Sequence, residues 1–201
     1  MKVRVWVGIV MLAGLTGAAL GADKPKKAAA GPPDEKAMME AMTKAGTPGD
    51  AHKKLEPFVG TFDTRVKMWM DPSKPAEESS GISENKWVLG NRWIEQRFEG
   101  TFMGQPFSGI GYTGYDNVKK KYVGTWMDSA STAMMTSMGT ADASGKMTMV
   151  GMMDDPMTRK SMKVTSKITM PDKDTQIMEM WCPGPTGKVY KMMEITYTRK
   201  K

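Results

Sequence analysis

The sequence has 201 residues, a formal net charge of +7, 25% charged residues and a single cysteine. This length makes one domain the default, and one cysteine excludes an intramolecular disulfide. The basic residues are dispersed rather than clustered with stacking aromatics, which argues against a nucleic-acid-binding groove.

Residues 1–21 have the layout of a secretory signal peptide. Lys2 and Arg4 precede an apolar run from Val5 to Leu15, and a small-x-small site lies before Ala22. Because the apolar run is shorter than the ~20 residues that span a bilayer, we expect cleavage rather than a retained anchor. The mature chain is predicted to be exported, periplasmic or secreted, without integral membrane association. Loss of the two basic residues leaves a charge of 7 − 2 = +5.

Residues 22–33 are rich in Lys, Ala and Pro and predict a disordered linker. Residues 34–57 predict a short N-terminal helical segment. Its first helix, Asp34–Lys44, has acidic residues in the first turn, where the helix dipole favours them. Its second helix, Ala51–Glu56, follows Asp50 as a candidate cap. We expect this segment to lie across one end of the domain that follows.

Residues 58–201 change to a period of two, which is typical of strands with two different faces. In the first of them, Phe62, Val66 and Met68 share one face, whereas Asp63 and Arg65 share the other. The same pattern and the intervening turn residues predict ten strands: Gly60–Met70, Glu77–Leu89, Arg92–Phe102, Phe107–Gly114, Tyr122–Asp128, Ala133–Ala141, Lys146–Met153, Ser161–Met170, Thr175–Cys182 and Val189–Arg199.

Short turns join these strands, and no segment between them is long enough for a helical crossover. The fold class is therefore predicted as all-β, an up-and-down antiparallel sheet. A twisted sheet of about eight to ten strands tends to close into a barrel, which removes its edges. A two-sheet sandwich is the alternative, and the meander order favours the barrel.

The chain resembles a bacterial family of unknown function whose members are predicted to adopt calycin-like (lipocalin-like) barrels. The resemblance covers roughly Met38 to Lys201 and rests on the segments Gly49–Leu55, Gly60–Phe62, Lys67–Met70, Leu89–Arg92, Gly114–Asp116, Tyr122, Thr125–Asp128 and Met193–Tyr197. It implies a fold and no activity. Haem-binding barrels of similar shape use a late histidine, and the absence of one here argues against haem; no cofactor is expected.

The alternation predicts an inner wall of Met, Phe, Ile and Val, which suits a small apolar or amphipathic ligand. The expected cavity-lining residues are Phe62, Val66, Met68, Trp126, Ile168 and Met170. We expect no catalytic residue and no classical metal site, so the protein is predicted to be a binding protein rather than an enzyme.

The 23 methionines are compatible with three hypotheses about their role. Flexible, polarisable Met can line an adaptable cavity or fill a solid barrel core as a purely structural protein. Alternatively, thioethers are soft donors for copper(I), and Met147 and Met149 share a strand face.

Three further residue types are candidates for chemistry. His52 is the single histidine and is expected to bond loop backbone on a helix at the barrel end, with a gatekeeper role as the alternative. Cys182 is expected to be a small buried side chain, with a reactive thiol or dimer cross-link as the alternative. Asp116 and Asp128 are expected to form turns; only as a close pair do they suit glycosidase-like chemistry.

Overall fold

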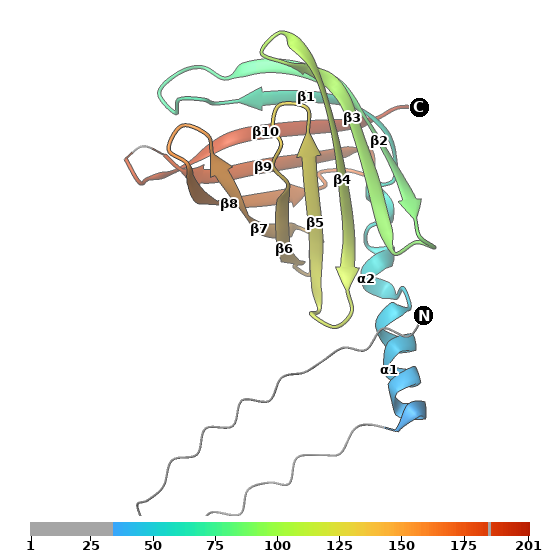
Figure 1. Cartoon of the computed structure of the whole chain (residues 1–201). Coiled ribbons are helices and arrows are strands. Elements are labelled where there is room, and N and C mark those ends of the chain that lie inside the picture. Colours follow the sequence, from blue (N-terminus) through green and yellow to red (C-terminus); the bar gives the residue numbers. More distant parts are fainter. Residues whose placement is uncertain (1–33, 185) are drawn as a thin grey trace, which may run out of the picture.

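A computed structural model describes residues 34–184 and 186–201 of the chain and shows a closed antiparallel barrel with helices at one end (Figure 1). The predicted signal peptide (1–21) and linker (22–33) lie outside the described residues. The helices and strands are α1 (Glu35–Gly46), α2 (Asp50–Lys53), the 3-10 helix η1 (Glu56–Phe58), β1 (Gly60–Met68), β2 (Glu77–Val88), β3 (Trp93–Phe102), β4 (Gln105–Asp116), β5 (Lys121–Asp128), β6 (Met135–Ala141), β7 (Met147–Asp155), β8 (Lys160–Thr169), β9 (Thr175–Pro183) and β10 (Val189–Arg199).

The strand order confirms the predicted up-and-down barrel. Each strand pairs with its neighbours in sequence, and β1 pairs with β10 to close the sheet. All pairings are antiparallel, and no Greek-key crossing occurs among the described strands. The barrel therefore replaces the sandwich alternative.

The period of two in β1 sorts its side chains as predicted. Phe62, Thr64 and Val66 are buried on the inner face, whereas Asp63 and Arg65 are exposed. The pattern was expected to continue to Met70, and this is wrong. β1 ends at Met68, and the side chain of Met70 is 65% exposed.

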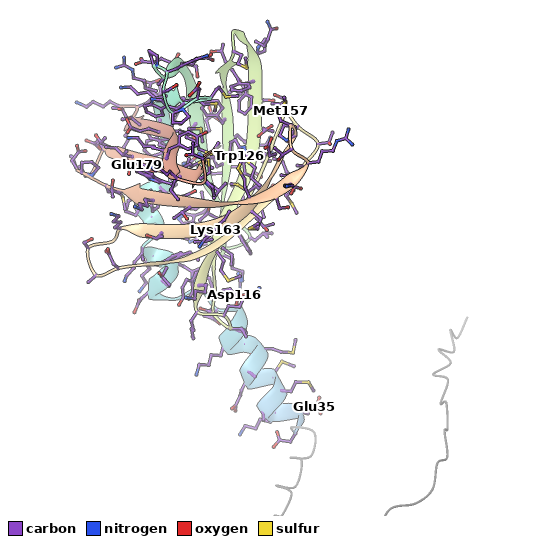
Figure 2. The ribbon with its side chains drawn as sticks, turned by 90° about the vertical axis from the view of Figure 1, so that its left-hand side faces the viewer. Glu35, Asp116, Trp126, Met157, Lys163 and Glu179 are labelled. Atoms are coloured by element: carbon purple, nitrogen blue, oxygen red, sulfur yellow. The ribbon has the colours of Figure 1, made fainter. Side chains whose placement is uncertain are left out.

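Helix α1 begins where the acidic first turn predicts. The Asp34 carboxylate caps it by accepting a hydrogen bond of 2.7 Å from the Ala37 N–H. However, α1 points away from the barrel, with Glu35 at its far end (Figure 2), and none of its residues is buried. The expectation that the whole helical segment crosses the barrel end is therefore wrong for α1. No helix among the described residues is long and apolar enough to cross a bilayer.

Helices α2 and η1 do close one end of the barrel. Leu55, between them, is completely buried. The barrel wall holds the backbone of this segment: the Arg199 guanidinium donates to the carbonyl oxygens of Pro57 and Val59, both at 2.7 Å, and the Tyr122 hydroxyl donates to Ala51 O at 3.1 Å. These bonds satisfy carbonyls that a short helix leaves unpaired.

Candidate ligand-binding site at the open end of the barrel

The two ends of the barrel differ. At the closed end, where β1 begins, Leu55 packs against four buried residues: Ile94, Tyr122, Met147 and Met149. At the opposite end, where β1 finishes and β2 begins, the described strands are joined by turns, and the described helices all lie elsewhere (Figure 1). We call this opposite end the mouth.

Side chains on the inner wall at the mouth are only half-buried. Strand alternation and register place a row of apolar side chains there, of which we call seven the mouth residues: Met68, Phe107, Trp126, Met135, Met153, Met162 and Met193. An inward-facing side chain in a filled barrel is fully covered by its neighbours. A wall residue that keeps part of its surface uncovered therefore borders space, and at the mouth no described helix covers these residues.

Trp126 lies flat against the inner wall because two glycines opposite it lack side chains. A Cβ at Gly109 would come within 2.3 Å of the Trp126 ring atom Cζ2, and one at Gly111 within 3.0 Å of Cε3. The indole Nε1 donates to the Asp128 carboxylate at 2.9 Å, which fixes the ring orientation. The result is an immobilised aromatic surface among apolar neighbours, suited to contact an apolar ligand.

Deeper in the barrel, a chain of buried polar groups links the wall to the closed end. Gln96 Nε2 donates to Ser83 Oγ, Ser83 Oγ donates to Asn85 Oδ1, and Asn85 Nδ2 donates to Phe58 O, each at 2.8 Å. Burial raises the pKa of the neighbouring Tyr197 hydroxyl to about 12, so it stays protonated. The chain satisfies polar groups that are expensive to bury and fixes this part of the interior.

One buried hydroxyl stands outside this chain. Thr64, 4% exposed on the inner face of β1, has no hydrogen-bond partner for its Oγ1 within the described residues. The buried polar chain and Thr64 therefore lie deeper than the mouth, whose inner wall is apolar and partly open.

Two hollows lie on the outside of the molecule. One of about 400 Å³ is lined by outward residues of β1 and β10, including Asp63, Lys67 and Glu194. The other, of about 570 Å³, lies at the start of α1 beside Lys36 and Met39. Both are open to solvent, and neither belongs to the barrel interior.

The structure spreads the six expected cavity-lining residues along the whole barrel. Phe62 is fully covered near the closed end, with the Arg199 guanidinium 4.6 Å from its ring centre, and Ile168 packs against the cluster around Leu55. Met170 follows the last residue of β8 and is half-buried. Val66 is buried in the β1–β10 part of the core.

Of those six residues, Met68 and Trp126 lie at the mouth and are half-buried. They are therefore the two that the mouth site retains.

Several mouth residues were missed from sequence. Alternation carried on from Met147 and Met149 places Met153 on the same face, so Met153 was within reach of the pattern, whereas Met192 and Met193 were not. In β10 a register shift between Lys191 and Met193 decides the matter, and such bulges leave little trace in a single sequence.

The proposed copper ligands Met147 and Met149 share the inner face, as expected, but lie at the closed end. They are 3% and 5% exposed and pack against Leu55. Thioethers at the mouth are the more accessible ones.

His52 caps a helix. Its Nδ1 accepts a hydrogen bond from the Gly49 N–H at 3.1 Å, so it, rather than the expected Asp50, bonds the start of α2. Burial lowers the pKa of His52 below its usual value of 6.5, the positive charge of Arg92 adds to this, and a hydrogen bond to the Tyr115 backbone opposes it.

This shift predicts a pH dependence of stability. The unfolded chain protonates His52 near pH 6.5 and the folded chain only at lower pH, so unfolding takes up a proton in that window. The free energy of unfolding should therefore fall as pH drops below about 6.5, by at most about 1.4 kcal/mol per pH unit from this group. Urea unfolding at pH 7.5 and 5.5 should show a smaller loss for His52→Asn, which keeps an acceptor for Gly49. An equal loss would assign the effect to the carboxylates that both proteins share.

Cys182 is a small buried side chain, and Asp116 and Asp128 form turns, as the sequence predicted. Cys182 is 2% exposed, and burial raises the pKa of its thiol, so it is not an activated nucleophile. Asp116 and Asp128 end β4 and β5, which run in opposite directions, so they lie at opposite ends of the barrel, roughly 23 Å apart along the strand. Each accepts turn hydrogen bonds from backbone N–H groups. A carboxylate pair for glycoside hydrolysis is therefore excluded.

Comparison with known proteins identifies a family and a fold. The family model described as "Protein of unknown function (DUF1579)" matches residues 47–199. No curated protein matches the sequence. Among solved structures, the S-type phycobiliprotein lyase CPES from Guillardia theta is 13% identical, with a TM-score of 0.55 over 84% of this chain and 99% of that one. Rv2717c from M. tuberculosis is 14% identical, with a TM-score of 0.56 over 77% and 100%. Identities this low show a shared calycin-like barrel fold.

Proposed function

The chain belongs to the DUF1579 family of proteins of unknown function, and we propose that its barrel binds a small apolar or amphipathic molecule through the mouth. The observation that carries this proposal is the row of inward apolar side chains at the mouth that remain half-uncovered. They offer an aromatic face at Trp126 and flexible thioethers, and burial of this surface by a ligand is favourable at about 25 cal/mol per Å².

The proposed role is binding without catalysis. The described residues contain no group of three or more His, Cys, Asp or Glu side chains arranged to hold a metal ion. His52 is occupied as a helix cap, and Cys182 is buried as a thiol. One of the similar solved structures is a phycobiliprotein lyase, so a barrel of this shape is compatible with enzyme-related roles. In this chain, the carboxylate beside Trp126, that of Asp128, accepts hydrogen bonds from the indole and from the Ala130 N–H.

The test uses the neutral dye Nile red, whose fluorescence rises and shifts to the blue in an apolar site. We expect saturable binding by the wild-type protein. Ser137→Phe adds a large inward side chain on β6 and should weaken binding at least tenfold, which corresponds to about 1.4 kcal/mol.

The matched control is Thr136→Phe, the same substitution one residue earlier, where the side chain points outward and is exposed. This variant should bind the dye as the wild type does. Equal weakening by both variants, or by neither, would place the dye outside the barrel.

We further propose that the protein acts in the periplasm or outside the cell. The support is the signal-peptide layout of residues 1–21. Mass spectrometry of protein isolated from a native host should find an N-terminus at Ala22. An intact N-terminus on all of the protein would contradict export by this route.

A further inference from the structure

The inner wall of β6 to β10 at the mouth concentrates sulfur atoms. Three buried residues there, Val164, Met180 and Cys182, are covered by half-buried methionines from five strands. We define the methionine cluster as the six members whose side chains face inward: Met135, Met153, Met162, Met178, Met180 and Met193.

Strand register brings several of these thioethers together. Met153 on β7 lies directly opposite Met162 on β8, and Met193 on β10 lies opposite both Met180 on β9 and Met68 on β1. Directly opposed residues have Cβ atoms about 4.5–5.5 Å apart. Because a methionine side chain is unbranched and flexible, two or three sulfur atoms can turn toward one point between the strands.

The donor chemistry selects a particular class of ion. Thioethers are neutral and soft, and soft sulfur ligands favour Cu(I), whereas Mg²⁺ and Ca²⁺ require oxygen donors and Zn²⁺ uses thiolate, imidazole or carboxylate. No grouping of three or more His, Cys, Asp or Glu side chains suited to a metal occurs in residues 34–184 and 186–201. A monovalent ion also costs less to transfer into an apolar wall than a divalent one.

Access distinguishes this cluster from the other methionines. Met153 and Met162 are half-buried at the mouth, whereas Met147 and Met149 are covered by Leu55 at the closed end. The α1 methionines Met38, Met39 and Met42 are exposed, but they lie on an isolated helix whose residues have no opposing sulfur-bearing wall.

We propose that the methionine cluster is a binding site for a soft monovalent metal ion, Cu(I) or its redox-stable analogue Ag(I), held by thioether sulfur atoms with Met153 and Met162 as the ligands at the entrance. The ion coordinates to sulfur lone pairs without proton release or electron transfer. Cys182 packs against the cluster and is not required for binding.

The experiment titrates Ag(I), in chloride-free buffer, into protein labelled with ¹³C at the methionine methyl groups. The methyl resonances of the methionine cluster should shift and saturate at a defined stoichiometry. Resonances of Met147, Met149 and the α1 methionines should stay unchanged. Shifts that follow exposure alone, largest at the α1 methionines, or that fail to saturate, would overturn the proposal and leave the cluster as apolar packing.

Variants separate the contributions. Met153→Leu combined with Met162→Leu should weaken Ag(I) binding at least tenfold, while Met38→Leu combined with Met39→Leu should leave it unchanged. Cys182→Ala should retain binding; loss in this variant, with binding kept in the Met153/Met162 variant, would assign the metal to the thiol instead. Nile red binding by the wild-type protein tests the proposed function separately, so a failure of Ag(I) binding and a failure of dye binding are told apart.

Discussion

Leu55→Ala should lower the free energy of unfolding by about 3 kcal/mol, within the range measured when a buried leucine is truncated to alanine. Leu55 is completely buried and is the residue on which α2, η1 and the surrounding strand ends converge. Its removal leaves a cavity between the closing segment and the wall, which rigid strands cannot collapse to fill. Urea unfolding followed by tryptophan fluorescence measures the change.

Leu89→Ala is the matched control for this prediction. Leu89 lies in the turn between β2 and β3 at the same end, with its side chain 72% exposed. The same truncation there should change stability by less than about 0.5 kcal/mol. If Leu55→Ala also lowered the free energy of unfolding by less than about 1 kcal/mol, α2 and η1 would not be packed into the end of the barrel through Leu55.

Arg199→Met should lower the free energy of unfolding by about 3 kcal/mol. The Arg199 guanidinium donates hydrogen bonds to Pro57 O and Val59 O and lies over the Phe62 ring, so it ties the last strand to the closing segment. Hydrogen bonds that involve a charged group contribute roughly 1.5–3 kcal/mol each, and methionine replaces the volume but none of the donors. Thermal and urea unfolding provide the measurement.

Arg65→Met is the control for this arginine. Arg65 makes an ion pair of 2.7 Å with Glu78 on the outer face, where its side chain is 68% exposed. An exposed pair of this kind contributes 0–1 kcal/mol, so the control should lose less than about 1 kcal/mol. Similar losses for both arginines would show that the backbone carbonyls at the closed end do not depend on Arg199.

The fold was accessible from sequence because nearly every strand alternates. β1 carries Phe62, Thr64 and Val66 on one face and charged residues on the other, and a sheet with one apolar face allows one register. Turn residues such as Asp142 and Gly145, which hydrogen-bond across the β6–β7 turn, marked the strand ends. The meander order then followed from connections too short for a crossover.

The helical segment was harder to predict because its conformation depends on tertiary contacts. Helical composition predicted α1 but not that it would stand away from the barrel with Met38, Met39 and Met42 exposed. At α2, the sequence predicted the Asp50 carboxylate as the helix cap. The buried His52 takes that role because it packs between the helix start and Tyr115, with ring centres 5.9 Å apart.

The candidate site was only partly predictable. Alternation fixes the face of a residue, and of the residues expected to line the cavity Trp126 and Met68 lie at the mouth. Alternation does not fix which end of the barrel is closed, and that depends on where Leu55 and η1 lie. For the same reason, Phe62 was expected to line the cavity although it is fully buried, with Arg199 over its ring. The adjacent pair Met192 and Met193 leaves the face undecided until the register shift in β10 is known.

The central claim is that a ligand enters the barrel at the mouth and not at the closed end or on the outer surface. Nuclear Overhauser contacts between bound Nile red and the ¹³C-labelled methionine methyl groups measure this directly. Contacts to Met135, Met153, Met162 and Met193, and none to Met147 or Met149, are the predicted result. Contacts confined to Met38, Met39 and Met42 on α1 would place the dye on the exposed helix and contradict the account.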